Sequence, residues 1–260
     1  MVKSTSIREI EAFNLNIKAF YTTRDGGYSK EPYDSFNLGL HVQDDNDAVL
    51  KNRIMLENHL GRKVVFMNQT HSNNVTYVTD KDISDSQKML DKTLPVRLGV
   101  DCDGIVTDSK NIALAVLTAD CLPLLLATED SSVIAAVHCG WKGIYGGIIK
   151  NAVDLIRSKS NAQIYAIIGA CIGPESFEVG PELLEKFESV ITDAKEAFVP
   201  TANSKYLCSL PKLCELSLNG LDIKKIYNLN LDTFKSDSHL FSYRRANITG
   251  RMASIIYINN

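Results

Sequence analysis

Residues 112–127 read IALAVLTADCLPLLLA, and this stretch determines the fold that we expect. It contains two apolar runs, 112–117 and 123–127, joined by a short polar turn. Continuously apolar runs of this length are typical of strands in sheets that are covered on both faces. Shorter runs of the same kind predict further strands in a strand-rich centre, at 104–107, 133–137 and 165–168.

Helical segments flank this centre. Residues 47–60 follow Asn46, a residue type that caps helix N-termini, and precede Gly61. Apolar residues at helical spacing predict another helix over 145–158. The remaining predicted elements are strands at 11–17, 64–67, 75–78 and 253–258, helices at 181–191 and 211–218, and a surface loop at 79–92. We therefore predict a mixed α/β fold in one domain that spans residues 1–260.

The composition is that of an ordinary globular protein. The 260 residues include 28 Lys and Arg and 31 Asp and Glu, for a net charge of −3, and 45% of the residues are hydrophobic. A near-neutral chain without a basic stripe is not typical of a nucleic-acid-binding protein. The longest apolar runs fall short of the about 20 residues that a membrane-spanning helix needs, and the N-terminus does not resemble a signal peptide. We expect a cytoplasmic protein with neither a nucleic-acid nor a membrane partner.

Three reactive side chains lie next to predicted strands: His71, Cys121 and His138. Loops at strand ends are where rigid scaffolds present reactive groups. Two imidazoles and one thiolate form an open zinc site, with a fourth position left for water. Their separations of 50 and 17 residues match no local metal motif. A buried thiol with two core histidines therefore remains the alternative interpretation.

Other polar segments are candidates for binding an anion or a substrate. Four glycines in 138–147 let backbone N–H groups approach an anion, although tight strand–helix packing explains them as well. Arginine suits bidentate contacts to phosphate or carboxylate. The residues that we predict to bind substrate are Arg24, Asn37, Asp103 and Arg245. Roles in turns or salt bridges are the alternatives, and Asp103 could also carry protons or support a metal ligand.

Taken together, these segments resemble the laccase-domain family, also called multicopper polyphenol oxidoreductase-like or YfiH-like. The family is associated with purine nucleoside phosphorylase activity. The resemblance covers almost the whole chain and rests on segments that occur in the family's order. These segments are 22–29, 35–39, 52–53, 69–72, 101–107, 118–123, 138–143, 172–174 with 177–180, and 241–245 with 249–253.

The resemblance implies that His71, Cys121 and His138 are the metal ligands and the catalytic residues. Zinc is the implied ion, with copper as a second possibility. The implied fold is a four-layer α/β/β/α arrangement with mixed sheets, similar to the catalytic domain of cytotoxic necrotizing factor.

The chain departs from the family pattern at three positions. Cys139 stands where the family commonly has Ala, Lys142 where it has Arg, and Asp232 where it often has Cys. An extra thiol beside His138 could shift the metal preference toward softer ions. The change at position 232 should matter little to zinc, because that position is not among the three ligands.

The leading hypothesis is a zinc-dependent purine nucleoside phosphorylase acting on adenosine, inosine and methylthioadenosine, with adenosine deamination as a second activity. Its partners are then a small-molecule nucleoside and phosphate, and no oligomeric state follows from the sequence. One alternative is a copper-dependent polyphenol oxidoreductase, although five histidines are too few for several coppers. Another is a hydrolase that edits peptidoglycan precursors, with Cys121 as nucleophile and His138 as base.

Overall fold

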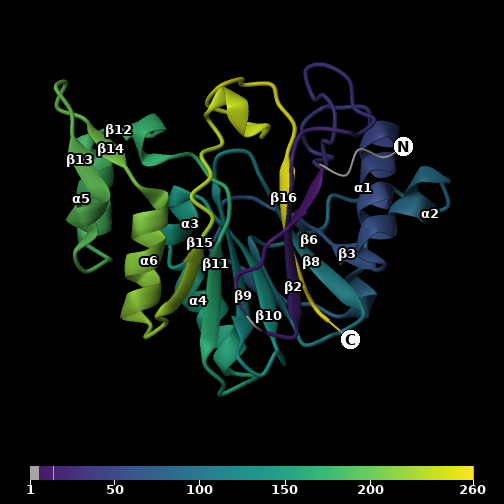
Figure 1. Cartoon of the computed structure of the whole chain (residues 1–260), viewed down its shortest axis with the longest axis horizontal. Helices are drawn as coiled ribbons and strands as arrows, with labels where there is room; N and C mark the ends of the chain where they lie inside the picture. Colours follow the sequence, from purple (N-terminus) through teal and green to yellow (C-terminus); the bar gives the residue numbers. More distant parts are fainter. Residues whose placement is uncertain (1–5, 14, 260) are drawn as a thin grey trace.

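Two large sheets form the centre of the protein, seen in a computed structural model that describes residues 6–13 and 15–259 (Figure 1). The first sheet has the order β1-β2-β16-β8-β3. Its strands are β1 (Ile7–Glu9), β2 (Ile17–Thr22), β16 (Met252–Ile258), β8 (Ile112–Thr118) and β3 (Lys63–Val65). The second sheet has the order β15-β11-β9-β10-β7-β5. Its strands are β15 (Lys225–Asn228), β11 (Ile164–Ile168), β9 (Leu122–Thr128), β10 (Ile134–Cys139), β7 (Gly104–Thr107) and β5 (Val75–Tyr77).

Both sheets are mixed. β3 runs parallel to β8, β5 to β7 and β11 to β15, whereas the other pairs are antiparallel. The two predicted runs of the opening stretch are confirmed as β8 and β9, yet they belong to different sheets. The turn between them therefore carries the chain from one sheet to the other.

Side chains alternate along each strand, so the two faces of each sheet pack against different layers. In β8, Leu114 and Val116 pack between the two sheets, whereas Ala113 and Ala115 face the opposite way. Side chains of a strand alternate between faces with a period of two, so each buried strand needs a cover on both sides. This explains why β8, β9 and β10 are buried along their whole length.

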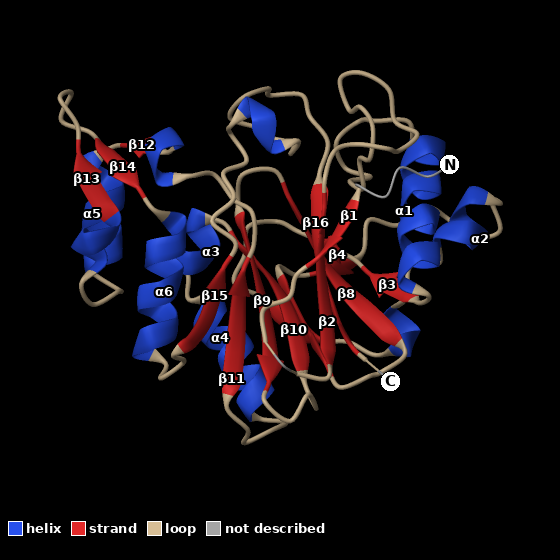
Figure 2. Ribbon diagram, viewed as in Figure 1, coloured by secondary structure: helices blue, strands red, loops and turns tan. Residues whose placement is uncertain are grey.

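Helices cover the outer faces of both sheets, which confirms the four-layer α/β/β/α arrangement (Figure 2). α1 (Asn46–Leu60) covers the first sheet and packs against α2 (Ser86–Leu90). The second sheet is covered by α3 (Trp141–Tyr145), α4 (Ile148–Arg157) and α6 (Leu210–Gly220). Beyond α6 lie α5 (Pro181–Glu188) and a small sheet of β12 (Glu178–Val179), β14 (Tyr206–Cys208) and β13 (Phe198–Pro200) (Figure 1). β4 (Met67–Asn68) pairs with β6 (Val100–Asp101).

Several sequence predictions need correction. The predicted strand at 11–17 is wrong, because most of it connects β1 to β2, and Asn14 lies outside the described residues. Its alternating apolar residues, such as Phe13 and Leu15, pack onto the edge of the core between the sheets without strand pairing. The N-cap of α1 is Asp45, whose side chain accepts a hydrogen bond from the backbone N–H of Asp47.

Other boundaries also differ. The helix predicted over 145–158 begins only at Ile148, since Gly147 adopts a left-handed conformation with φ of 83°. The predicted surface loop 79–92 contains α2, in which Ser86 and Met89 are buried. The small outer sheet was not predicted, because its strands are two or three residues long. None of the described helices is long and apolar enough to cross a membrane.

Candidate metal centre

Three strand ends bring His71, Cys121 and His138 together. β10 pairs with β9 so that His138 lies opposite Pro123, two residues after Cys121. His71 follows β4 and lies in the turn after it. One ligand atom from each of the three residues lies within 4.8 Å of the others. The structure thus supports the predicted grouping of these three side chains.

The geometry of the three side chains suits zinc. The Sγ of Cys121 lies 3.8 Å from the Nε2 of His71. The rings of His71 and His138 pack edge to face, with their centres 4.8 Å apart. In tetrahedral zinc sites a sulfur and a nitrogen ligand stand about 3.6 Å apart, from bond lengths of about 2.3 and 2.1 Å. Three protein ligands leave a fourth position open, as in catalytic zinc sites. A thiolate with two imidazoles would also accept copper.

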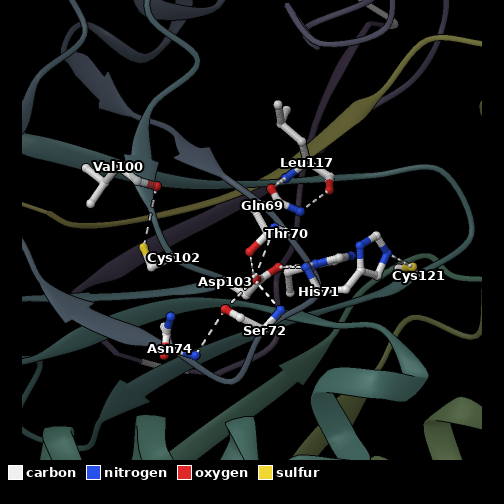
Figure 3. A network of polar contacts seen from close by, with 11 residues as sticks. Gln69, Thr70, His71, Ser72, Asn74, Val100, Cys102, Asp103, Leu117 and Cys121 are labelled. Atoms are coloured by element: carbon white, nitrogen blue, oxygen red, sulfur yellow. Dashed lines mark hydrogen bonds and ion pairs between the residues drawn. The ribbon is translucent and has the colours of Figure 1, made fainter.

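The buried carboxylate of Asp103 holds this group in place (Figure 3). Its Oδ1 accepts hydrogen bonds from the Nδ1 of His138 at 2.8 Å and from the backbone N–H of His71 at 3.0 Å. Its Oδ2 accepts from the backbone N–H and the hydroxyl of Ser72, both at 2.7 Å, and from the N–H of Thr70. Because Nδ1 of His138 is engaged, its Nε2 is the atom left to bind a metal.

These contacts also set the charge of Asp103. Burial would raise the pKa of the carboxyl, but the hydrogen bonds from His138 and Ser72 hold it well below its usual range. The carboxylate is therefore ionised and acts as a fixed acceptor behind the candidate metal ligands.

Left-handed backbone conformations occur at one candidate ligand and directly before another. His71 has φ of 62° and Asp120, which precedes Cys121, has φ of 100°. The hydrogen bonds to Asp103 hold His71 in this conformation. Asp120 is held by the hydroxyl of Thr233 and the backbone N–H of Arg244, each at 2.6 Å. Residues other than glycine keep such conformations only where their surroundings impose them, often at functional sites.

Gly140 explains part of the glycine-rich segment. A Cβ atom at this position would lie 3.1 Å from Cδ2 of His71 and 3.3 Å from Sγ of Cys121. A side chain here would press against both candidate ligands, so glycine suits the position. The helix that follows, α3, has only five residues. The structure therefore favours packing over anion binding as the reason for this glycine.

The Cys121 thiol is set up to bind a metal as a thiolate. Burial would raise the pKa of the Cys121 thiol, but hydrogen bonds from His138 and His71 lower it to about 6. Burial opposes the charge on His138, yet its contacts with Asp103 and Cys121 raise its pKa to about 9, so this imidazole must release a proton when it binds a metal. In contrast, burial raises the pKa of the five other thiols, which belong to Cys102, Cys139, Cys171, Cys208 and Cys214. Cys121 is therefore the thiol that ionises near neutral pH.

The departures from the family pattern lie away from the ligand atoms. Cys139 points to the opposite face of β10 from His138 and is buried under the helices. Strand alternation thus keeps the extra thiol out of the ligand group. Lys142 lies over the ring of Trp141, and Asp232 accepts a hydrogen bond from the backbone N–H of Gly173.

A cavity of about 520 Å³ opens onto the three ligands. This volume lies in the range of small-molecule sites, roughly 300–1,000 Å³. Its walls combine aromatic rings with polar side chains that can fix a ligand's orientation. Besides the ligands, these include His41, Gln69, Trp141, Phe177, Tyr243, Arg244 and Arg251.

The four residues predicted to bind substrate are not among the described residues that line this cavity. Arg24 forms an ion pair with Asp34. Arg245 donates to the backbone carbonyls of Thr233 and Leu240. Asn37 is buried, as is Asp103. Their positions favour orienting roles over contact with a ligand in the cavity.

Neighbours of these residues line the cavity instead. Arg244 and Arg251 belong to the same arginine-rich segments as Arg245, and His41 lies four residues after Asn37. Residues 241–250 form a loop without periodicity, so no sequence signal distinguished Arg244 from Arg245. Only the fold shows which of these side chains reach the cavity.

Comparisons with known proteins show the family of the chain. The sequence model of the family described as multi-copper polyphenol oxidoreductase laccase matches residues 18–259. A Haemophilus influenzae protein named purine nucleoside phosphorylase is 40% identical over 246 residues, covering 93% of this chain and 94% of the relative. The Escherichia coli purine nucleoside phosphorylase YfiH is 33% identical, with the same coverage. The crystal structure of Bacillus licheniformis hypothetical protein YfiH is similar, with a TM-score of 0.89, 32% identity and coverage of 99% of this chain and 98% of that chain.

Replacing Asp103 tests whether it positions the ligands. We expect Asp103→Asn to weaken zinc binding by about 10- to 100-fold, because the amide leaves fewer acceptors for His138 and the 70–72 turn. Competition with a chromophoric chelator measures the affinity. Asp101→Asn is the matched control, since Asp101 is exposed and accepts from the side chain of Asn68. Equal zinc affinity in both variants would show that Asp103 does not support the site.

Alkylation tests the charge state of Cys121. In zinc-stripped protein, we expect iodoacetamide to label Cys121 with a midpoint near pH 6, because only the thiolate reacts. Since this pKa lies below that of an ordinary thiol, the thiolate persists above pH 6 and is lost as pH falls through that value. Zinc should protect Cys121 above the midpoint. Peptide mass spectrometry measures the labelling, and a midpoint near the ordinary thiol pKa of about 8.5 would contradict the expectation.

Proposed function

The chain belongs to the multi-copper polyphenol oxidoreductase laccase family, and we propose that it is a zinc-dependent purine nucleoside phosphorylase. Its substrates on this proposal are adenosine, inosine and methylthioadenosine. The observation that carries the proposal is the His71, Cys121 and His138 group at the base of a nucleoside-sized cavity. The names of the relatives over nearly the whole chain support the reaction class.

The cavity suits a purine nucleoside in its chemistry. Trp141, Phe177 and Tyr243 contribute aromatic rings to the cavity lining, and purine bases stack on rings of this kind. Gln69 is fixed by two hydrogen bonds to the backbone of Leu117, so it forms a rigid part of the wall. A flat apolar base and a polar sugar would thus each find matching surfaces.

Phosphorolysis exchanges one bond at the sugar for another. A phosphate oxygen forms a bond to C1′ of the ribose while the bond from C1′ to the base nitrogen breaks. The base leaves with that electron pair and takes up a proton, giving free base and ribose 1-phosphate. An enzyme for this reaction must hold an anion beside the sugar and exclude competing water.

The residues of the chain have separate roles in this proposal. His71, Cys121 and His138 would hold zinc, which supplies a Lewis acid at the cavity floor. Asp103 orients His138 and the turn that carries His71. Gly140 leaves room for both ligands. Adenosine deamination, in which water adds at C6 and ammonia leaves, would use the same cavity as a second activity.

Copper-dependent oxidation of polyphenols is supported less well. A multicopper oxidase needs enough histidines for several coppers, and the chain has five. Two of them lie elsewhere: His59 is in α1, and His239 pairs with Asp25. The description of the family as multi-copper therefore fits the histidine count of this chain poorly.

One observation favours a hydrolase as the second candidate. The Cys121 thiol has a pKa near 6 and is hydrogen bonded to histidine, as in cysteine nucleophiles. On this alternative the substrate is a peptidoglycan precursor, and the Cys121 thiolate attacks the carbonyl carbon of its amide or ester while the amine or alcohol leaves with a proton from His138. His138 then acts as base toward the water that releases the acyl group from sulfur. Protection of Cys121 by zinc would favour the metal role, because a ligated thiolate cannot attack.

Loss of the thiol tests the proposed function. Cys121→Ala removes one of the three proposed zinc ligands. We expect this variant to lose zinc and to have a kcat/KM for adenosine that is lower by about 100-fold or more, because catalysis depends on the metal. Chromatography of adenine, inosine and ribose 1-phosphate measures the products, and elemental analysis measures zinc. Cys208→Ala is the control, because Cys208 is a buried thiol in the helix-side core. Full zinc content and activity in Cys121→Ala would overturn the assignment.

A further inference from the structure

The metal cavity has a smaller neighbour that shares its wall. A compartment of about 230 Å³ adjoins it, and His41, Tyr243 and Arg251 line both spaces. A water molecule occupies about 30 Å³ of liquid, so the compartment has room for a tetrahedral anion and several waters. A ligand in the metal cavity and a small anion in the side compartment would therefore meet at Arg251.

The lining of the side compartment favours an anion. Arg251 is the one charged side chain among the described residues that line it, and no carboxylate lies among them. Other polar side chains in the lining are neutral and can donate hydrogen bonds: Gln43, Asn247 and Thr249. A positive charge with neutral donors and no competing acid is the environment that a phosphate group prefers.

The side chain of Arg251 is held in place with donors to spare. Its Nη1 donates to the carbonyls of Thr249 and Gly250, each at 3.0 Å. No hydrogen bond from its Nε or Nη2 to another described residue is found. A guanidinium has five N–H donors in a planar fork, so several remain for an oxyanion.

The backbone around Arg251 is built to carry it. Its N–H donates to the side chain of Asn37 at 2.9 Å, and its carbonyl accepts from the N–H of Leu38. Gly39 lies directly below the side chain, because a Cβ there would come within 2.9 Å of Cγ of Arg251. The interlocked 37–39 and 249–251 segments therefore pre-organise the arginine, and Asn37 acts on the site through it.

The charged residues that line the metal cavity also favour an anion. Among its described lining residues, Arg244 and Arg251 are cations and Asp120 is the carboxylate. Both oxygens of Asp120 already accept hydrogen bonds, from Thr233 and Arg244. A divalent metal ion that is bound by a single thiolate and neutral imidazoles would keep a net positive charge. The two neighbouring spaces thus favour a substrate pair that carries negative charge.

We propose that Arg251, at the junction of the two spaces, is the binding residue for a phosphate group in the side compartment. The inference rests on the proposed function and deepens it, because it assigns the anion that phosphorolysis requires to a named subsite. That phosphate is either inorganic phosphate, as the second substrate, or the 5′-phosphate of a nucleotide. Both share the oxyanion that the guanidinium recognises.

Equilibrium dialysis of the zinc-loaded full chain with radiolabelled inorganic phosphate tests the proposal without turnover. We expect Arg251→Gln to weaken phosphate binding by about 10- to 100-fold, since a charge-assisted contact is lost. Arg251→Lys keeps the positive charge but lacks the planar guanidinium. Its phosphate affinity should therefore lie between those of the wild type and Arg251→Gln. Arg157→Gln is the control, because Arg157 also donates to a backbone carbonyl but lies exposed at the end of α4. Elemental analysis and urea midpoints confirm equal zinc content and folding.

Competition then separates the two sources of phosphate. If inorganic phosphate is the ligand, saturating adenosine leaves phosphate bound. If a nucleotide is the ligand, adenosine 5′-monophosphate displaces phosphate, and its affinity, unlike that of adenosine, depends on Arg251. Unchanged binding of both phosphate and nucleotide in Arg251→Gln would overturn the proposal. Failure of the proposed function would look different: the wild-type protein would cleave no nucleoside, yet its phosphate binding would still depend on Arg251.

Discussion

The hydrogen bonds that a buried carboxylate requires position the candidate metal site of this protein. Asp103 is buried within the fold, and an ionised group there is tolerated only where donors surround it. Its donors are the ring of His138 and the backbone of the turn that carries His71. Satisfying one charge therefore fixes two of the three candidate metal ligands. The third, Cys121, is placed by the pairing of β9 with β10.

The four-layer architecture brings these parts together. β8 and β9 lie in different sheets, so the turn between them crosses the layers and presents Cys121 at their edge. β10 and the turn after β4 supply the histidines at the same edge. Loops from distant parts of the chain then complete the cavity with aromatic rings and arginines. A rigid core thus holds the ligands, while loops shape the space above them.

The sequence predicted the elements whose side chains face the core, because burial imposes a pattern. The apolar runs of β8 and β9 and the capped helix α1 are examples. The strand predicted at 11–17 was wrong because its apolar residues pack against the core without forming strand hydrogen bonds. Spacing alone did not show that the three ligands converge, since convergence depends on strand register. The sequence could not show which arginines line the cavity, because a loop has no period from which orientation can be read, whereas strand alternation would have placed Cys139 away from His138.

X-ray absorption at the zinc edge, on protein purified without added metal, tests the central claim most directly. If His71, Cys121 and His138 bind one zinc ion, the spectrum contains one sulfur at about 2.3 Å and two imidazole nitrogens at about 2.0–2.1 Å, with a light atom in the fourth position. A first shell without sulfur, or one with two or more sulfur atoms, would contradict the account. The same would follow if the protein held no stoichiometric metal.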